Sequence, residues 1–440
     1  MSHEMIVLVM FLGMMVLMAT GQRVFGMIGF IAVATALLLW GDGAAAMGFN
    51  ASIKLLNWYP LLTLPMFVFM GYMLSESGIA NDLYSMLHVW TGRLRGGLAI
   101  GTILLMVLIS AMNGLSVAGM AIGCSIAMPE MLKRNYDRRM VSGVIQAGSS
   151  LGILVPPSVV FVLYGMIARQ PVGQLWLAGV VPGLLMAALF LIYVVVRCRL
   201  QPELAPLASE DSMKISLREK LRLLSAGMIP LVIMFIVIGL FLFGITSLVE
   251  SSAVGALASL LVAWGRRRLT KTVLHNTVRQ TLNISAMFMW IIMAALAFGA
   301  VFDGLGAVKA IEGLFLNQWG LSPWHVIILM QLSFVIMGMF LDDTAMLVIV
   351  APLYVPLVNA MGFSLVWFGV LYTITCQIAY ITPPFGYNLF LMKAMAPKDF
   401  PLKDIYASII PFSALMFVTI VLIMIFPEIA LWLPEKFMVK

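Results

Sequence analysis

The chain has 440 residues, of which 62% are hydrophobic and only 10% are charged. Together with a mean hydropathy of +1.06, this composition leaves too little polar surface for a soluble fold of this size and indicates a polytopic membrane protein. The net charge of +7 does not indicate nucleic-acid binding, because the basic residues fall in short loops between apolar runs and report membrane orientation instead. We interpret the cysteines as packing residues without metal-ligand spacing: Cys124, Cys198 and Cys376.

Ten apolar runs are long enough to cross about 30 Å of hydrocarbon. The first run lacks a basic leader and a small-residue cleavage site, so it is predicted to be a retained span. The sequence therefore predicts an all-α polytopic membrane protein with about ten transmembrane spans. The predicted spans are 4–21, 24–41, 58–76, 140–168, 175–197, 225–247, 248–265, 281–303, 363–392 and 408–432.

Two further apolar stretches, 97–132 and 322–361, are too long for one span, and each has polar or small residues near its centre. Basic residues flank 97–132 on both sides, which places both of its ends in the cytoplasm, whereas both ends of 322–361 fall outside. Each stretch is therefore predicted to be a re-entrant helical hairpin, and the two enter from opposite faces. Counting ten crossings puts both termini in the periplasm.

Paired prolines interrupt two of the predicted spans: Pro156-Pro157 within 140–168 and Pro383-Pro384 within 363–392. Proline has no N–H and clashes with the carbonyl one turn earlier, so each pair breaks its helix and frees carbonyl oxygens. An unwound segment at bilayer depth persists only where protein, water or a bound ion satisfies those oxygens. Both breaks are therefore candidate ion or substrate sites.

The landmarks of the first half recur in the second at a nearly constant distance. Ser116 and Thr344, in the two hairpin tips, are 228 residues apart, and Pro156 and Pro383 are 227 apart. Each half holds an odd number of crossings, so the second copy is predicted to be inverted, as in many secondary transporters. The predicted organisation is a first repeat at 1–200, a cytoplasmic linker at 201–224 and a second repeat at 225–440.

Five short motifs follow one another along the chain in a distinctive order. They are 64–71 (LPMFVFMG), 152–158 (GILVPPS) followed by Tyr164-Gly165, 178–183 (AGVVPG), 250–255 (ESSAVG) and Thr382-Pro383-Pro384 with Gly386. In this order and spacing the chain resembles, over nearly its whole length, the large membrane subunit of the tripartite ATP-independent periplasmic (TRAP) transporters. The first tip differs from the family's frequent Gly-Ser-Ser in having Gly114-Leu115-Ser116, and Gln377 stands where an Asn is common.

The resemblance implies an elevator-type importer of the wider ion-transporter superfamily in a bacterial inner membrane, driven by sodium and carrying an organic anion, commonly a carboxylate. It also implies two partners, a small four-helix membrane subunit and a periplasmic substrate-binding protein. No cofactor is expected beyond sodium as the coupling ion.

Sodium is a hard cation that prefers oxygen ligands, and a helix break facing a hairpin tip supplies carbonyls, hydroxyls and amides. For any single hydroxyl, a hydrogen bond to a helix carbonyl is an equally good interpretation. In the first half the cation-binding candidates are Asn113, Gly114, Ser116, Ser149, Ser150, Gly152 and Pro156. In the second half they are Asp342, Asp343, Thr344, Thr375, Gln377, Thr382 and Gly386.

The adjacent acids of the second tip are the strongest polar signal, because intramembrane carboxylates usually mark ion or proton pathways; a helix cap at a wet tip is the alternative. An anionic substrate requires donors between the tips. The candidates are Asn113, Ser116 and Thr344, with Arg169 at a span end as either a substrate contact or an interfacial snorkelling residue. Glu250 is interpreted as a contact for the delivering protein or, preferably, as a helix cap.

Three other classes of function compete with a binding-protein-dependent transporter. A membrane enzyme is disfavoured because the sequence has no HExxH, Walker or nucleophile-elbow motif. An ion channel is disfavoured because opposed hairpins close a site from one side at a time, whereas channels favour a continuous pore. A stand-alone cation-coupled anion carrier of the same superfamily is the nearest alternative.

Overall fold

The computed structural model describes residues 2–41, 43–91, 94–114, 116–206, 216–313, 320–339, 341, 343–383, 386–398 and 400–438. Within these ranges the chain forms helices and connecting turns and contains no β-strand. The prediction of an all-α fold is confirmed for the described residues, and its apolar helices are consistent with a polytopic membrane protein.

The first half contains eleven α-helices and four short helical turns. They are α1 (His3–Ala19), α2 (Val24–Leu39), α3 (Ala44–Leu56), η1 (Tyr59–Leu62), α4 (Thr63–Glu76), α5 (Ile79–Thr91), α6 (Gly97–Asn113), α7 (Ser116–Ile122), η2 (Gly123–Ala127), α8 (Met128–Lys133), α9 (Arg138–Ser150), η3 (Leu151–Ile153), α10 (Val159–Ala168), α11 (Val172–Leu200) and η4 (Pro202–Leu204).

The described part of the second half contains ten α-helices. They are α12 (Leu217–Leu242), α13 (Leu248–Gly265), α14 (Lys271–Gly304), α15 (Ala307–Glu312), α16 (Pro323–Gly338), α17 (Asp343–Ala360), α18 (Leu365–Tyr380), α19 (Tyr387–Met395), α20 (Leu402–Ile425) and α21 (Glu428–Met438).

Five helices in the described ranges are long and apolar enough to cross a membrane: α11, α12, α13, α14 and α20. The segments 46–56 and 59–76 pass the same test together, although they are bent by 63°. Several other predicted spans form shorter apolar helices. Helices α1 and α2 have 17 and 16 residues, about 25 Å each at 1.5 Å per residue. The number of crossings therefore stays a prediction.

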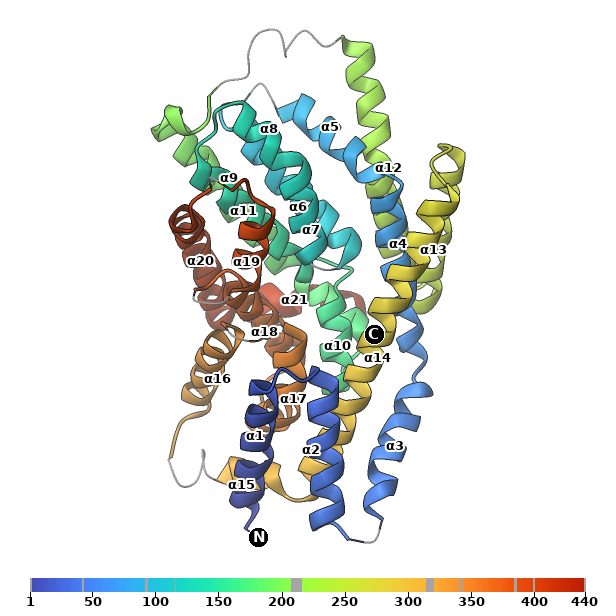
Figure 1. Cartoon of the computed structure of the whole chain (residues 1–440), viewed down its shortest axis with the longest axis vertical. Helices are drawn as coiled ribbons and strands as arrows, with labels where there is room; N and C mark the ends of the chain where they lie inside the picture. The colour runs from blue at the N-terminus through green and yellow to red at the C-terminus, as the bar shows by residue number, and fades with distance from the viewer. Residues whose placement is uncertain are drawn as a thin grey trace.

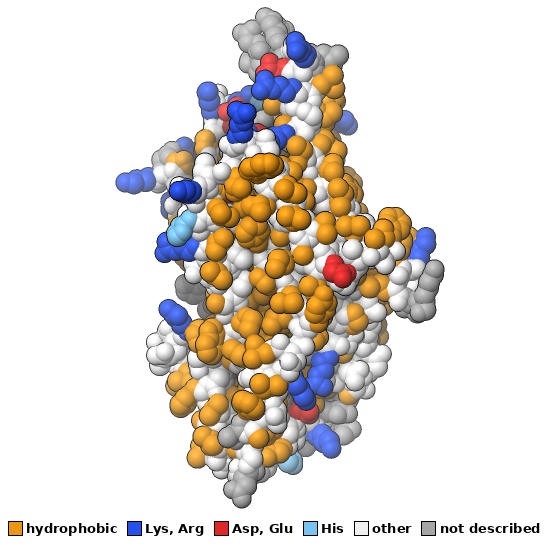
Figure 2. Space-filling model, turned by 90° about the vertical axis from the view of Figure 1, so that its right-hand side faces the viewer, with side chains coloured by type: hydrophobic (Ala, Val, Ile, Leu, Met, Phe, Trp, Pro, Cys, Tyr) orange, Lys and Arg blue, Asp and Glu red, His pale blue; other side chains and the backbone are white. Residues whose placement is uncertain are grey.

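The helices run mostly along the long axis of the molecule (Figure 1). Helices α1, α2, α3 and α15 gather at the end that carries the N-terminus, and α5, α8 and the start of α12 lie toward the opposite end. On the face drawn in Figure 2, hydrophobic side chains cover most of the middle, and Lys and Arg are most numerous near the upper end. This distribution fits a protein whose middle section contacts lipid.

Helices α9 and α18 occupy the centre of the bundle. Residues 140–150 of α9 and 366–380 of α18 are all buried. The central helices are therefore the two that lead into the proline breaks. Helix α9 carries polar residues in this buried stretch, including Ser142, Gln146 and Ser149, each 0% exposed. Polar groups at such positions need partners inside the protein.

Side-chain caps fix several helix starts. Asp137 accepts from the Met140 N–H at 3.0 Å before α9. At α13, Ser247 accepts from the Glu250 N–H at 3.3 Å, and the Glu250 carboxylate accepts from the Ser247 N–H at 2.7 Å. This reciprocal pair is a capping box. The preferred interpretation of Glu250 as a helix cap is confirmed.

Two parts of the chain differ from the span prediction. Helix α3 falls in a stretch that was not predicted as a span, because Asn50, Ser52 and Lys54 lower its hydropathy. The predicted span 408–432 is instead the helix α20, which ends at Ile425, followed by α21. Pro427 separates the two helices, and α21 packs on α11. A proline at that position removes a helix N–H and favours the break.

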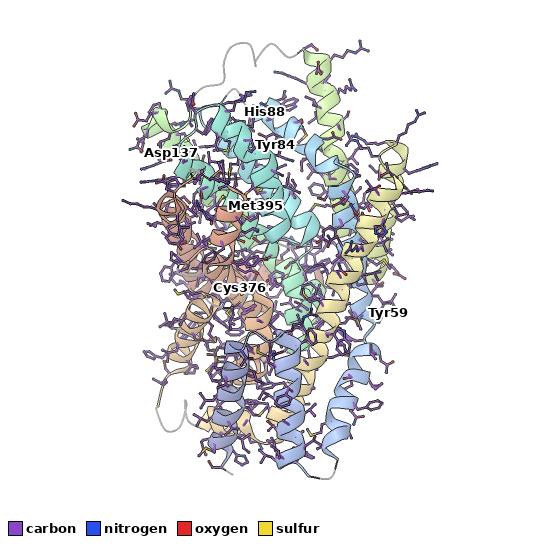
Figure 3. The ribbon with its side chains drawn as sticks, viewed as in Figure 1. Tyr59, Tyr84, His88, Asp137, Cys376 and Met395 are labelled. Carbon is purple, nitrogen blue, oxygen red and sulfur yellow. The ribbon has the colours of Figure 1, made fainter. Side chains whose placement is uncertain are left out.

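A polar cluster joins α5 to the end of the first hairpin. The Arg134 guanidinium donates to the Glu130 carboxylate at 2.9 Å, and its NH2 group lies 2.9 Å from Nε2 of His88. Tyr84 stacks on the His88 ring, with 5.8 Å between ring centroids (Figure 3). Burial and the neighbouring Arg134 lower the pKa of His88, although Glu130 opposes that effect. The neutral imidazole is therefore the form that fits between α5 and α8.

The three cysteines are buried, and no disulfide joins any two of them. Cys124 Sγ lies 3.8 Å from Met392 Sδ, in a contact between the first hairpin and α19. These positions agree with their interpretation as packing residues.

Candidate functional site

The tip of the first hairpin lies directly on the first proline break. Gly114 follows α6 with a φ of +66°, and its carbonyl accepts from the Val159 N–H at 3.4 Å. A Cβ at Gly114 would come within 2.8 Å of the Pro157 carbonyl oxygen. Only glycine combines this left-handed backbone with so close an approach. The structure therefore brings the predicted tip and the predicted break together.

Side chains from three places bond backbone carbonyls around the first break. Gln377 Nε2 donates to the Ser150 carbonyl at 2.9 Å, and Trp176 Nε1 donates to the Ser158 carbonyl at 3.3 Å. The Ser158 hydroxyl donates to the Ile153 carbonyl. The Ser158 carbonyl also accepts from the Val162 N–H at 3.3 Å. Protein groups thus supply donors to carbonyls on both sides of the break, and the Ile153 carbonyl is reached by a side-chain hydroxyl.

The two serines before the break donate hydrogen bonds to carbonyls of their own helix, which is the alternative interpretation that the sequence left open. The Ser149 hydroxyl donates to the Gln146 carbonyl at 2.9 Å, and the Ser150 hydroxyl donates to the Ala147 carbonyl at 2.8 Å. A hydroxyl that donates its one proton keeps lone pairs that can face a cation. Gly152, in η3, and Pro156 are buried beside these serines. A helical partner therefore leaves the oxygen of each serine usable as a ligand.

Ser116 forms a hydrogen bond with Asn388, which was not among the predicted site residues. Asn388 Nδ2, in α19 of the second half, donates to the Ser116 hydroxyl oxygen at 3.0 Å. Ser116 is 3% exposed and Asn388 is 0% exposed. The signal in the sequence was an asparagine four residues after Pro384, within the predicted span 363–392. The first tip is thus completed by an amide from the other half.

The second hairpin packs on α18 in a comparable way. Thr375 Oγ1 donates to Oε1 of Gln331, on α16, at 2.5 Å and also contacts the Leu371 carbonyl at 2.8 Å. At the end of α16, a Cβ on Gly338 would clash with the Ala379 Cβ. The second arm, α17, is held by Tyr372, whose hydroxyl donates to the Asp343 carbonyl at 2.6 Å.

The second break is a compact turn. Thr382 Oγ1 donates to the Ile378 carbonyl at 2.5 Å, and the Gly386 N–H donates to the Thr382 carbonyl at 3.1 Å. A Cβ at Gly386 would lie 2.7 Å from the Tyr380 carbonyl oxygen. Gly386 therefore allows the chain to fold back closely before α19 begins.

Three of the predicted site residues have side chains that are not described, and a fourth is exposed. Asp342 lies outside the described residues, as do the side chains of Asn113 and Thr344. Arg169 is exposed at the end of α10 with a φ of +53°, and its role as a substrate contact stays a prediction. Among the described residues, no three His, Cys, Asp or Glu side chains form a metal-binding group.

The two breaks are connected through Gln377. This side chain extends from α18, one turn before the second break, to Ser150, at the end of α9 and the start of the first break. Cys376, its neighbour in sequence, lies near mid-height of the molecule (Figure 3). Gln377 and Ser150, one candidate residue from each half, are therefore joined in the buried centre of the bundle.

A bundle of apolar helices with a hairpin tip set against a broken helix defines a polytopic membrane protein of the transporter class. The chain belongs to the family of the DctM component of the tripartite ATP-independent periplasmic transporters, whose family model matches residues 11–429. The resemblance seen in the sequence is therefore confirmed. Large permeases of this family operate with a periplasmic binding protein and a small membrane subunit.

Several relatives match over most of their length. The chain is 30% identical over 380 residues to the C4-dicarboxylate TRAP transporter large permease protein DctM of Pseudomonas aeruginosa, covering 86% of each chain. It is 28% identical to the DctM protein of Vibrio cholerae, covering 91% of this chain and 92% of the relative. It is 26% identical to the sialic acid permease SiaM of that organism, covering 86% and 87%.

A solved structure shares the fold. The YdaH transporter of Alcanivorax borkumensis superposes with a TM-score of 0.65 at 15% sequence identity, covering 91% of this chain and 90% of that one. The named relatives are transporter permeases, and this chain is likewise a transport protein and not an enzyme.

Proposed function

We propose that the chain imports an organic anion across the bacterial inner membrane, driven by a sodium gradient. The contact of Gly114 with Pro157 and Val159 carries the proposal, because it places a hairpin tip against an unwound helix. This arrangement supplies carbonyl and hydroxyl oxygens inside the bundle, and such oxygens suit a hard monovalent cation.

The substrate class follows from the relatives together with the donors near the tips. C4-dicarboxylates and sialic acid both carry carboxylate groups. The Ser116 hydroxyl and the Asn388 amide are buried, uncharged groups at the first tip. A carboxylate held there would rely on neutral donors and on the charge of bound cations. We therefore propose a carboxylate as the transported anion.

Transport follows an elevator mechanism in this proposal. The two hairpins, the broken helices α9–α10 and α18–α19, and their shared contacts form the moving unit, while the other helices form the scaffold. The two halves are related as inverted repeats, with Gly114 and Ser116 of the first tip corresponding to 342–344 of the second. A periplasmic binding protein delivers the substrate, a small membrane subunit supports the scaffold, and both termini lie in the periplasm.

Sodium binding is tested with the purified permease. Its thermal unfolding temperature is measured in sodium chloride and in N-methyl-D-glucamine chloride at equal ionic strength. The proposal expects a higher unfolding temperature in sodium, rising with concentration, because a ligand that binds only the folded state stabilises it. Equal unfolding temperatures in the two salts, together with uptake driven by a proton gradient alone, would contradict sodium coupling.

A further inference from the structure

Gln377 is buried in the centre of the bundle and forms a hydrogen bond between the halves. Its side chain is 0% exposed, and Nε2 donates to the Ser150 carbonyl at 2.9 Å. The two residues are 227 residues apart, the same interval that separates Pro156 from Pro383. Gln377 therefore stands at the position in the second half that corresponds to Ser150 in the first.

The Ser150 carbonyl lies where α9 ends and the 3-10 turn η3 begins. A carbonyl oxygen has two lone pairs, so it can accept from Gln377 in addition to an N–H of η3. Gln377 therefore supplies a donor from the other half of the chain at the point where the helix changes its hydrogen-bond pattern. The carbonyl acceptor also fixes the orientation of the amide, because the opposite orientation would set two oxygens against each other.

The other amide atom of Gln377 is an acceptor without a hydrogen-bond partner among the described residues. Oε1 is fully buried, and a buried acceptor without a partner destabilises the fold. A glutamine in this environment is explained if its amide has a role that offsets that cost. A residue that only filled space would be replaced by an apolar one of the same shape at little cost.

We propose that Gln377 is a positioning residue that couples the two breaks, so that a cation bound in one half changes the cation affinity of the other. The proposal rests on the sodium coupling proposed above. The end of α9 and the end of α18 share one hydrogen bond, so a shift of either break alters the position of the other. Coupling of this kind is reciprocal between the two sites.

A purely structural role for Gln377 makes a different prediction. A residue that only capped α9 would change stability or overall affinity for sodium and leave the cooperativity of sodium binding unchanged. The Hill coefficient of sodium-dependent uptake therefore separates the two roles. Gln331 provides the matched control, because it is also a buried glutamine with one amide atom that has no partner in the described part of the chain, and its bond to Thr375 lies within the second half.

The experiment uses the permease with its partner proteins in proteoliposomes and measures uptake against sodium concentration. The variants are Gln377→Met, which keeps the shape without the donor, Gln377→Asn, which keeps the amide one methylene shorter, and Gln331→Met. The expected result is a wild-type Hill coefficient above 1 that falls to about 1 in both Gln377 variants. Gln331→Met is expected to keep the wild-type Hill coefficient.

Three results would overturn the coupling role while leaving sodium-driven transport intact. They are a wild-type Hill coefficient of 1, unchanged coefficients in the Gln377 variants, or a failure of both Gln377 variants to assemble when Gln331→Met assembles. The last result would assign Gln377 to folding. Uptake by the wild-type protein that does not respond to sodium would instead contradict the proposed function, and the coupling role with it.

Discussion

Gly114 offers the sharpest test of the contact between the first tip and the first break. Replacing Gly114 with alanine adds a Cβ that would lie 2.8 Å from the Pro157 carbonyl oxygen and 3.1 Å from the Val159 nitrogen. Ordinary contacts of a Cβ begin at about 3.4 Å, so the tip must move away from the break. The new methyl group therefore disturbs the oxygen cage proposed to hold sodium.

The free-energy cost of Gly114→Ala has two contributions, one from the backbone conformation and one from the close contact. Alanine in the left-handed region costs about 1–2 kcal/mol, and relieving the contact with backbone atoms costs about 1–3 kcal/mol more, as for an overpacked core. Gly244→Ala is the matched control, because Gly244 has the same φ of +66° and no described atom lies within 4 Å of the place that a Cβ would occupy. The control therefore carries the backbone contribution alone, and the difference between the two variants isolates the contact contribution. A difference of about 1–3 kcal/mol between the two variants corresponds to about a 5- to 150-fold decrease in the equilibrium constant for packing the tip on the break.

The assay measures the sodium concentration that gives half-maximal uptake in proteoliposomes containing the partner proteins. Gly114→Ala should raise this concentration about 5- to 150-fold relative to Gly244→Ala, while the two variants lose similar stability from the backbone term. Equal sodium dependence in the two variants would refute the reasoning, because the tip would then have no role in the cation site.

Three further outcomes are expected. Asp343→Asn should weaken sodium-driven uptake, since a carboxylate at bilayer depth favours a cation beside it; unchanged sodium dependence in vesicles would exclude that role. Ser116→Ala and Asn388→Ala should each reduce uptake, and their double-mutant cycle should give a coupling of about 0.5–1.5 kcal/mol; additive effects would show that the 3.0 Å bond has no functional weight. Burial beside Arg134 lowers the pKa of His88 from 6.5, so the contribution of its neutral form is complete above pH 6.5 and is lost as the pH falls through the lowered pKa. The unfolding temperature should therefore fall more on acidification in the wild-type protein than in His88→Gln, and parallel profiles would contradict this.

The parts of the fold that depend on local chemistry could be predicted from the sequence. A proline pair acts on its own helix, so Pro156-Pro157 predicts a break without knowledge of any neighbour. Chain length and hydropathy likewise predict helices of the observed kind at 175–197 and 281–303, which correspond to α11 and α14. Helix α3 escaped prediction because its polar residues hide a helix that is stabilised by packing on α14.

The partners of the breaks could not be predicted, because they come from distant parts of the chain. Asn388 bonds Ser116 across 272 residues, and Gln377 bonds Ser150 across 227. No spacing rule connects an asparagine in α19 with a hairpin tip in the first half. Trp176 is a further case, since its indole, on α11, bonds the Ser158 carbonyl.

These partners change the physical role of the prolines. An isolated proline break in lipid would leave several carbonyl oxygens without hydrogen bonds, at a cost of several kcal/mol each. Here, side chains of Gln377, Trp176 and Ser158 bond three of the carbonyls around the first break, so protein groups support the unwound segment independently of any bound ion. If the proposed cation site lies here, it is largely preformed, and a preformed site requires less reorganisation on binding than one that the ion must assemble. The proposal then expects the selectivity of the site to depend on the residues that hold the break open as much as on the oxygens that face the ion.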